Sequence, residues 1–502
     1  MPPHTTALLI LTHGDAADPI PSAVQQLAPP SVRRGLHAKV AGALVHGAGG
    51  GDPDWGLVAG HYEQAGRFGE AAWAYQQASA AARGRGALAE ARTYLSLALT
   101  QLDHVTPGPD RDRREIAVRL QRGFLTGAVE TYTAVGDFER CLQLCGADLS
   151  GDEVVVTLLA LASYYTLRAD LSRAAQVLES LRAGPGEGRP WLRPVIEGGF
   201  GVLAWLRGEF DAAGSHLEQA ARGLTAADQQ EIDSSWFRPD DPVASMHVYL
   251  ALVGFVRGDL IGAEAELAQA ARRADQLDFP QGPFSLAFAR FVETWLRIET
   301  GQFDRAAVLA TDLIDQAEQH GFDAFRLLGG TQQAAVSAVA ALGAEDLDPT
   351  ALSAHIATMT TFVDILRTVE LNIYAALFDG VVARLLTAAG QPGQARARLD
   401  TTLQLARDTG MHFYDAELLR LRAHTHADPD AHCADLGAAL DLARRQGATQ
   451  FELLAALDDF KLRGEPARAA LADAFSRFPA NSALPELAQA RDAVESFDPQ
   501  LG

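Results

Sequence analysis

The chain has 502 residues, of which 48% are hydrophobic but only 7% aromatic, and its formal net charge at pH 7 is -22. The hydrophobic excess is mostly Ala and Leu, which form helices readily and let helices pack closely. Because so negative a chain repels a phosphate backbone and no basic stripe offsets the charge, we exclude nucleic acid as a direct ligand.

Cysteine count and hydropathy bear on the compartment. The three cysteines are an odd number in so long a chain, which indicates a reducing environment. The N-terminus lacks the basic and apolar regions of a signal peptide, and no apolar run is long enough to span a membrane. We therefore expect a cytoplasmic protein with no membrane contact.

The N-terminal segment differs from the rest. Residues 1–30 contain six prolines and no sustained hydrophobic period, which predicts a loose arm or a cap. From residue 31 a helical pattern begins, and it places four apolar residues on one face. These are Val32, Leu36, Val40 and Leu44.

The segment from Asp52 to Arg83 has the pattern of one complete helical hairpin. A helix over residues 55–65 is expected to end at Gly66, since glycine readily takes the left-handed conformation that terminates helices. Phe68 follows, and a second helix has apolar residues at i, i+3, i+4 and i+7. These are Ala71, Ala74, Tyr75 and Ala78. So small a hairpin buries one face of each helix only, so it must stack on copies of itself.

The same turn signature recurs along the chain. A glycine or its substitute comes first, an apolar residue or proline follows two positions later, and a small residue five positions later. The first positions are Gly136, Ala169, Gly208, Gly258, Gly301, Gly390 and Gly464. The repeats, about 40 residues long, predict an all-α, tetratricopeptide-like α-solenoid, a right-handed superhelix of about ten to twelve stacked hairpins. Gly208, Gly258 and Gly301 are each expected at a helix end with positive φ.

One long interruption divides this pattern. Residues 224–243 carry Trp236 and Phe237 among acidic and polar side chains, which is unusual for a plain connector. We therefore expect an N-terminal half of the solenoid at 31–223, an irregular loop at 224–243 and a C-terminal half at 244–502.

Motifs of common enzymes are absent. There is no P-loop, G-x-S-x-G, H-E-x-x-H, EF-hand loop or G-x-G-x-x-G in the sequence. We predict no catalytic residue, metal site or cofactor. The pair Cys141 and Cys145 is interpreted as small core residues. A cluster of potential ligands is interpreted as a solvated turn. Its members are His424, His426, His432 and Cys433.

Aromatic residues in the middle of the chain indicate where a ligand binds. Counted back from the turn glycines, four of them fall near positions that line the concave face of such solenoids, although packing between hairpins also explains them. They are Trp205, Phe255, Phe291 and Trp295. The loop residues Trp236 and Phe237 and the polar residues His247, Arg290 and Arg326 complete the predicted site. Its composition favours an apolar or amphipathic ligand over a highly charged one.

Segments at both ends resemble a known family. RRGLHAKVAGAL and HYEQAGRFGEAAWAYQQASAAARGRGALAEARTYLSLAL near the start, and DLARRQGATQFELLAALDDF near the end, resemble the tetratricopeptide region of bacterial signalling proteins. Those proteins join a class III nucleotide cyclase to a STAND-type ATPase, and MalT-type activators are relatives. The likeness covers about residues 31 to 495, the middle only in repeat pattern. No cyclase or ATPase module precedes residue 31, so we expect neither activity here.

The sequence thus favours a non-enzymatic regulatory or scaffolding protein. Its concave groove would hold a peptide, a protein segment or an apolar small molecule, and a homodimer is possible. Two alternatives remain open. One is an enzyme with a pocket inside the superhelix, and the other is a sensor domain that works with a separate STAND-type ATPase.

Overall fold

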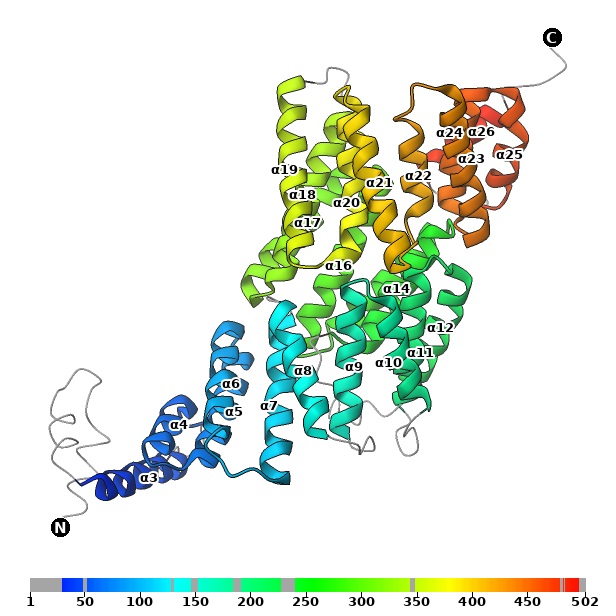
Figure 1. Cartoon of the computed structure of the whole chain (residues 1–502). Coiled ribbons are helices and arrows are strands. Elements are labelled where there is room, and N and C mark those ends of the chain that lie inside the picture. The colour runs from blue at the N-terminus through cyan, green and yellow to red at the C-terminus, as the bar shows by residue number, and fades with distance from the viewer. Residues whose placement is uncertain are drawn as a thin grey trace. The chain divides into compact units, whose positions relative to one another are not determined.

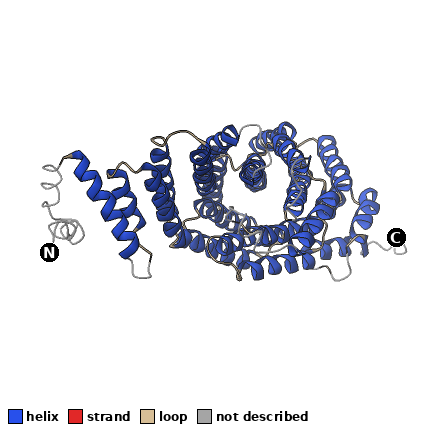
Figure 2. Cartoon of the chain, turned by 90° about the horizontal axis from the view of Figure 1, so that it is seen from below, coloured by secondary structure: helices blue, strands red, loops and turns tan. Residues whose placement is uncertain are grey.

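The computed structural model describes residues 29–47, 52–127, 131–145, 152–183, 191–226, 240–343, 348–478, 482 and 484–495. In these ranges the chain forms 23 helices and no strand (Figures 1 and 2). The all-α prediction is confirmed. Over the same ranges, no helix combines the length and the apolar character that a membrane crossing requires.

The chain divides into two compact units. The first consists of residues 1–127 and 132–148, and the second of residues 128–131 and 149–502. The predicted halves at 31–223 and 244–502 remain a prediction. The first unit holds α3 (Pro30–Gly47), α4 (Trp55–Gln64), α5 (Phe68–Gly84), α6 (Leu88–Leu102), α7 (Pro109–Gly127) and nearly all of α8 (Thr131–Cys145).

The first unit begins with the hairpin expected from the sequence. The Asp54 carboxylate caps α4 by accepting the Leu57 amide proton at 3.0 Å, and Gly66 turns the chain with φ of 69°. The four apolar positions predicted for the second helix are all buried. On α3 the predicted apolar face is only partly covered, since Val40 is buried but Val32 is 50% exposed.

The turn predicted at Gly136 is wrong, because α8 runs through this residue. The two residues after it hold the helix against α7. Asp137 accepts hydrogen bonds from Arg119 and Arg122 of α7, and Phe138 packs 5.6 Å from Phe124. Glycine inside a helix costs only about 1 kcal/mol relative to alanine, so these contacts outweigh it.

The second unit is a stack of hairpins, each with a first and a second helix. The first helices are α9 (Asp152–Leu167), α11 (Leu192–Leu206), α14 (Pro242–Val256), α16 (Gln281–Glu299), α18 (Asp323–Leu342), α20 (Asn372–Ala388), α22 (Asp415–Ala423), α24 (Thr449–Arg463) and α26 (Pro485–Glu495). The second helices are α10 (Leu171–Ala183), α12 (Phe210–Ala226), α15 (Leu260–Ala274), α17 (Phe303–His320), α19 (Pro349–Thr368), α21 (Pro392–Thr409), α23 (Pro429–Gln446) and α25 (Glu465–Ser476). Each first helix from α9 to α24 contacts its own partner and also the next first helix, as stacking requires.

The turns inside these hairpins follow the predicted signature. Gly208, Gly258 and Gly301 have φ of 74°, 85° and 71°, which confirms their expected conformation. Ala169 adopts the same left-handed conformation without being a glycine. These four turns therefore reverse the chain at the residues that the pattern singled out.

The second unit also winds back on itself. The backbone amides of His412 and Phe413 both donate to the Leu206 carbonyl oxygen, at 2.8 and 3.1 Å, and the Gln446 side chain donates to the His412 carbonyl at 2.9 Å. In addition α14 contacts α24 and α9 contacts α20. Figure 1 shows green α14 beneath orange α22 and α24. The space between the first helices is consequently closed off by later hairpins.

Candidate ligand-binding site

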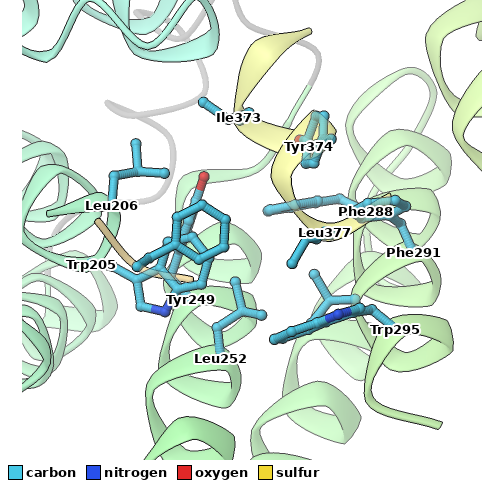
Figure 3. Close-up of a pocket in the computed structure, with 12 residues that line it drawn as sticks. Trp205, Leu206, Tyr249, Leu252, Phe288, Phe291, Trp295, Ile373, Tyr374 and Leu377 are labelled. Atoms are coloured by element: carbon cyan, nitrogen blue, oxygen red, sulfur yellow. The ribbon is translucent and has the colours of Figure 1, made fainter. Parts of the chain in front are cut away.

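An apolar cavity lies between the first helices of the second unit (Figure 3). Its volume is about 30 Å³, enough for roughly one water molecule. Side chains from α11, α14, α16 and α20 and from the turn before α22 surround it. They are Trp205, Leu206, Tyr249, Leu252, Phe288, Phe291, Val292, Trp295, Ile373, Tyr374, Leu377 and Phe413. The helices that the stacking brings side by side thus share one aromatic interior.

The aromatic rings of this interior pack against one another in pairs and small groups. Trp205 stacks on Phe413 with 4.4 Å between ring centroids, and its other neighbour, Tyr249, meets it edge to face. On the opposite side of the cavity Phe291 contacts Tyr374 at 4.9 Å. Each such pair contributes about 0.5–1.5 kcal/mol beyond its burial. The walls of the cavity are therefore largely aromatic.

Two polar atoms in these walls have no hydrogen-bond partner. Trp205 and Trp295 are only 6% and 4% exposed, and no described residue accepts a hydrogen bond from either indole N–H. An unpaired buried donor costs about 1–3 kcal/mol and calls for an explanation. A ligand that supplies hydrogen-bond acceptors would satisfy both donors.

The predicted aromatic residues come together here in part. Trp205, Phe291 and Trp295 line the cavity. Phe255 is fully buried and packs edge to face on Trp295, with 5.3 Å between centroids. All four are therefore also core residues, and their role in binding remains a prediction.

The predicted polar contacts lie away from the residues that line the cavity. His247 Nδ1 lies 2.6 Å from Glu266 Oε2, Arg290 donates to Gln316 at 2.6 Å, and exposed Arg326 lies 3.6 Å from Asp323. Trp236 and Phe237 fall outside the described residues. Binding roles for these five residues remain predictions.

Four aromatic lining residues were not predicted. Tyr249 and Phe288 lie on the same helices as Phe255 and Phe291, six and three residues earlier. Helical spacing could therefore have identified Phe288, which shares a helix face with Phe291, but not Tyr249, because residues six apart lie on different faces. The other two are Tyr374 and Phe413, which reach the cavity from later hairpins only because the unit winds back on itself.

A group of charged side chains adjoins the aromatic interior. Tyr414, whose ring contacts Trp295 at 6.4 Å, donates its hydroxyl to Glu299 at 3.1 Å. Burial, together with the negative charge of Glu417, raises the pKa of Glu299 to about 7. Arg420 binds both carboxylate oxygens of Glu417, at 2.6 and 2.7 Å. An apolar pocket and a buried ionic network thus share one inner surface.

Burial accounts for Cys141, and hydrogen bonds to aspartates account for two of the clustered histidines. Cys141 is buried, as interpreted from the sequence, while the side chain of Cys145 lies outside the description. His424 lies 2.8 Å from Asp458 and His426 lies 2.9 Å from Asp435. Among the described residues, no group of three or more His, Cys, Asp or Glu side chains could hold a metal ion.

The fold defines a helical-repeat protein of the tetratricopeptide-like α-solenoid class. No protein-family model and no curated protein matches the chain. A solved structure titled as a Rap protein complexed with competence and sporulation factor is 12% identical, covers 76% of this chain and 99% of its own, and has a TM-score of 0.50.

Further solved structures resemble the chain more loosely. The Rap conjugation gene regulator of plasmid pLS20, in complex with the Phr* peptide, is 13% identical over 76% of this chain and 98% of its own, with a TM-score of 0.44. Yeast Tom70 is 13% identical over 93% of this chain and 96% of its own, with a TM-score of 0.34. At such low identity these likenesses concern the fold alone.

Proposed function

We propose that the protein is a non-enzymatic binding module that holds an apolar or amphipathic segment of a peptide or protein against the first helices of its second unit. The observation that carries this proposal is the aromatic cavity with two unpartnered indole donors. A peptide supplies both apolar side chains for the rings and carbonyl oxygens for the N–H groups.

Binding on this surface requires a rearrangement. The cavity of about 30 Å³ is too small for a side chain, so part of its wall must move. Phe413 is the wall residue that belongs to a turn, between α21 and α22, and it covers the Trp205 ring. We infer that a ligand side chain takes the place of Phe413 on Trp205, which is binding by induced fit.

The similar fold of the Rap protein gives this proposal limited support. That protein is complexed with competence and sporulation factor, so a solenoid of this general shape accommodates a binding partner. The argument is an analogy of folds, and the site itself must supply the chemistry.

Finer aspects of the role are also proposals. The resemblance of residues 31–495 to cyclase and STAND ATPase signalling proteins favours a regulatory role in bacterial signalling, alongside a separately encoded ATPase. The odd cysteine count favours the cytoplasm. An apolar small molecule is the alternative ligand, and a homodimer the alternative assembly.

The test combines a peptide array with two conservative variants. Purified protein is applied to an array of random acetylated peptides, and bound sequences are measured by calorimetry against Trp205→Phe and Trp295→Phe. Each variant removes one ligand hydrogen bond, worth about 0.5–1.5 kcal/mol, so affinity should fall roughly 2–10-fold. Each variant also shrinks a buried ring and lowers the melting temperature, so affinities are compared at a temperature where circular dichroism shows every protein to be folded.

Trp73 in the first unit provides the matched control, since it is 38% exposed and remote from the cavity in sequence. Trp73→Phe should leave peptide affinity unchanged. The proposal is wrong if no peptide binds, or if both cavity variants bind with the affinity of the original protein.

A further inference from the structure

An acidic cluster continues the inner surface beyond the aromatic cavity. We define it as Glu299 of α16, Glu417 of α22 and Glu486 of α26, three first helices of the second unit. Glu299 and Glu486 are partly exposed, whereas Glu417 is buried. Glu299 and Glu486 therefore keep some access to solvent. The negative charge of Glu417 acts on both of the other carboxylates.

The cations that face this cluster do not balance it. Arg420 binds Glu417, but it shares its guanidinium with Asp458. Arg384 of α20 lies near Glu299, whose hydrogen-bond donor is the Tyr414 hydroxyl. Burial and the Glu417 charge raise the pKa of both Glu299 and Glu486, whereas Asp458, which Arg420 and His424 contact, has a lowered pKa. Arg384 and Arg420 act on Glu299, and Arg420 on Glu486, but within the described ranges neither carboxylate forms a direct ion pair, and burial outweighs these cations.

A second, independent observation points the same way. Gln450 of α24 is only 2% exposed, and its side-chain oxygen receives no hydrogen bond from any described residue. The Gln450 side chain forms a hydrogen bond with Glu486. The Oε2 atom of Glu486 also lacks a donor within the described ranges. Two acceptors without donors lie together at this end of the surface. A group rich in N–H donors would satisfy them.

We propose that the acidic cluster binds the cationic group of a peptide ligand, an ammonium or a guanidinium, while a neighbouring apolar side chain of the same peptide enters the aromatic cavity. This inference rests on the proposed function and adds the ligand class, a basic and apolar peptide. The two parts are adjacent because Trp295 and Glu299 lie one helical turn apart on α16. Tyr414 contacts both of these residues.

The chemistry of the two parts is complementary. The aromatic cavity has donors without acceptors, and the acidic cluster has acceptors without donors. Backbone carbonyls of a peptide match the first part, and a basic group matches the second. The net charge of -22 also attracts a cationic ligand and speeds its association at low salt.

Cation binding at this place is coupled to pH. A bound cation favours the ionised form of Glu299, which faces Glu417, Arg420 and Tyr414 from the α22 segment and Arg384 from α20. As the pH rises from 6 to 8, more Glu299 is ionised before binding. The affinity for a ligand with a lysine side chain, which stays protonated here, should therefore rise over this range, and the affinity for a neutral ligand should not.

The experiment measures the full chain by calorimetry against four synthetic tripeptides at pH 7, where a peptide's terminal amine is still mostly protonated. Acetyl-Leu-Phe-Lys-amide carries a basic side chain and Leu-Phe-Gln-amide carries only a terminal ammonium. Acetyl-Leu-Phe-Gln-amide is neutral, and acetyl-Leu-Phe-Glu-amide is acidic. At least one cationic peptide should bind about tenfold more tightly than the neutral one, as expected for a charge-assisted contact. The two cationic peptides distinguish a side-chain amine from a terminal amine.

Variants locate the contact. Glu486→Gln and Glu299→Gln should each reduce the preference for the cationic peptide to about threefold or less and leave neutral-peptide affinity unchanged. Glu318→Gln is the matched control, because Glu318 is exposed on the second helix α17 and the change removes the same charge. This control should keep the full preference.

The outcomes separate the two proposals. Equal binding of cationic and neutral peptides overturns the acidic cluster as a cation site but leaves the binding module intact. The same holds if Glu318→Gln lowers the preference as much as the cluster variants do. If none of the four peptides binds although the array yields bound peptides, this inference fails and the proposed function stands; if the array yields none either, both fail.

Discussion

Gly208 is subject to two separate constraints. Its φ of 74° lies in the left-handed region, and a β-carbon built there would lie 2.1 Å from Gln446 Nε2 and 3.2 Å from the His412 carbonyl oxygen. Gly301 has nearly the same φ, 71°, but nothing lies within 4 Å of its β-carbon position. The two glycines therefore allow conformational strain to be separated from close packing.

We predict different costs for alanine at these two glycines. Gly301→Ala should lower the free energy of unfolding by about 1 kcal/mol, the cost of a left-handed L-residue. Gly208→Ala should cost a further 1–3 kcal/mol or so, because the methyl group displaces the Gln446 side chain from the His412 carbonyl. Urea unfolding curves of both variants measure the difference.

Removal of the Gln446 side chain checks the cause. In a Gln446→Ala background, Gly208→Ala should cost less than it does alone, since the clashing amide is gone. Equal costs in both backgrounds would mean that the contact with Gln446 is not responsible.

The raised pKa of Glu299 predicts an unusual pH dependence of stability. The ordinary value is 4.5 and the folded value is about 7. Between these values the unfolded chain has released a proton that the folded chain still holds, so the free energy of unfolding falls as the pH rises. Glu299→Gln removes this penalty. It should stabilise the ligand-free protein by on the order of 1 kcal/mol at pH 8, allowing for solvent screening, and by almost nothing near pH 4.5.

Melting temperatures of both proteins across this pH range provide the measurement. A gap between the two melting curves that stays constant from pH 4.5 to 8 would show that the Glu299 carboxyl does not titrate near neutrality.

At the scale of helices, Asp379 joins three consecutive elements. Its fully buried carboxylate on α20 accepts hydrogen bonds from Arg398 at 2.6 Å and Thr402 at 2.7 Å, both on α21, and pairs with Arg367 on α19. Burial raises the pKa of Asp379, and the two arginines oppose this effect. The carboxylate is tolerated in the interior because two cations meet it there.

We predict that Asp379→Ala destabilises the protein by about 3–5 kcal/mol, because it leaves Arg367 and Arg398 without their buried partner. Asp364 offers a control on the same arginines, since it lies 3.7 and 3.9 Å from them but is 63% exposed. Asp364→Ala should change stability by less than about 1 kcal/mol. Chemical unfolding of both variants shows whether burial, rather than mere proximity to the arginines, determines how much each aspartate contributes to stability.

The helices themselves show what could be predicted from the sequence. Turns at Gly208, Gly258 and Gly301 were predictable because the left-handed conformation is decided by a single residue type at one position. Gly136 has the same local pattern but lies inside α8, where the contacts of Asp137 and Phe138 with α7 override it. A local signature fails where contacts with another helix are stronger.

The candidate site was predictable to a smaller extent. Trp205, Phe291 and Trp295 were placed by counting back from the turn glycine of their own hairpins. Tyr374 and Phe413 do not, because they reach the cavity only through the curvature accumulated over several hairpins. That curvature is a sum of small rotations between repeats, and no single stretch of sequence encodes it.

At the scale of the whole molecule, the second unit departs from a simple repeat array. In a linear array each hairpin contacts only its neighbours, so stability is nearly a sum of local terms. Here Leu206 accepts hydrogen bonds from His412 and Phe413, and α14 contacts α24. Hairpins that are distant in sequence are therefore coupled, and local unfolding of one should lower the stability of the other.

Hydrogen exchange of the glycine variants tests this coupling. Gly208→Ala, at the end of α11, should reduce the protection of backbone amides in α22 and α24 as well as in α11 and α12, because the bonds to Leu206 hold the two regions together. Gly301→Ala has no such neighbour and should affect mainly α16 and α17. Mass spectrometry of the exchanged peptides would contradict the coupling if Gly208→Ala left α22 and α24 as well protected as before, since the unit would then behave as a linear array.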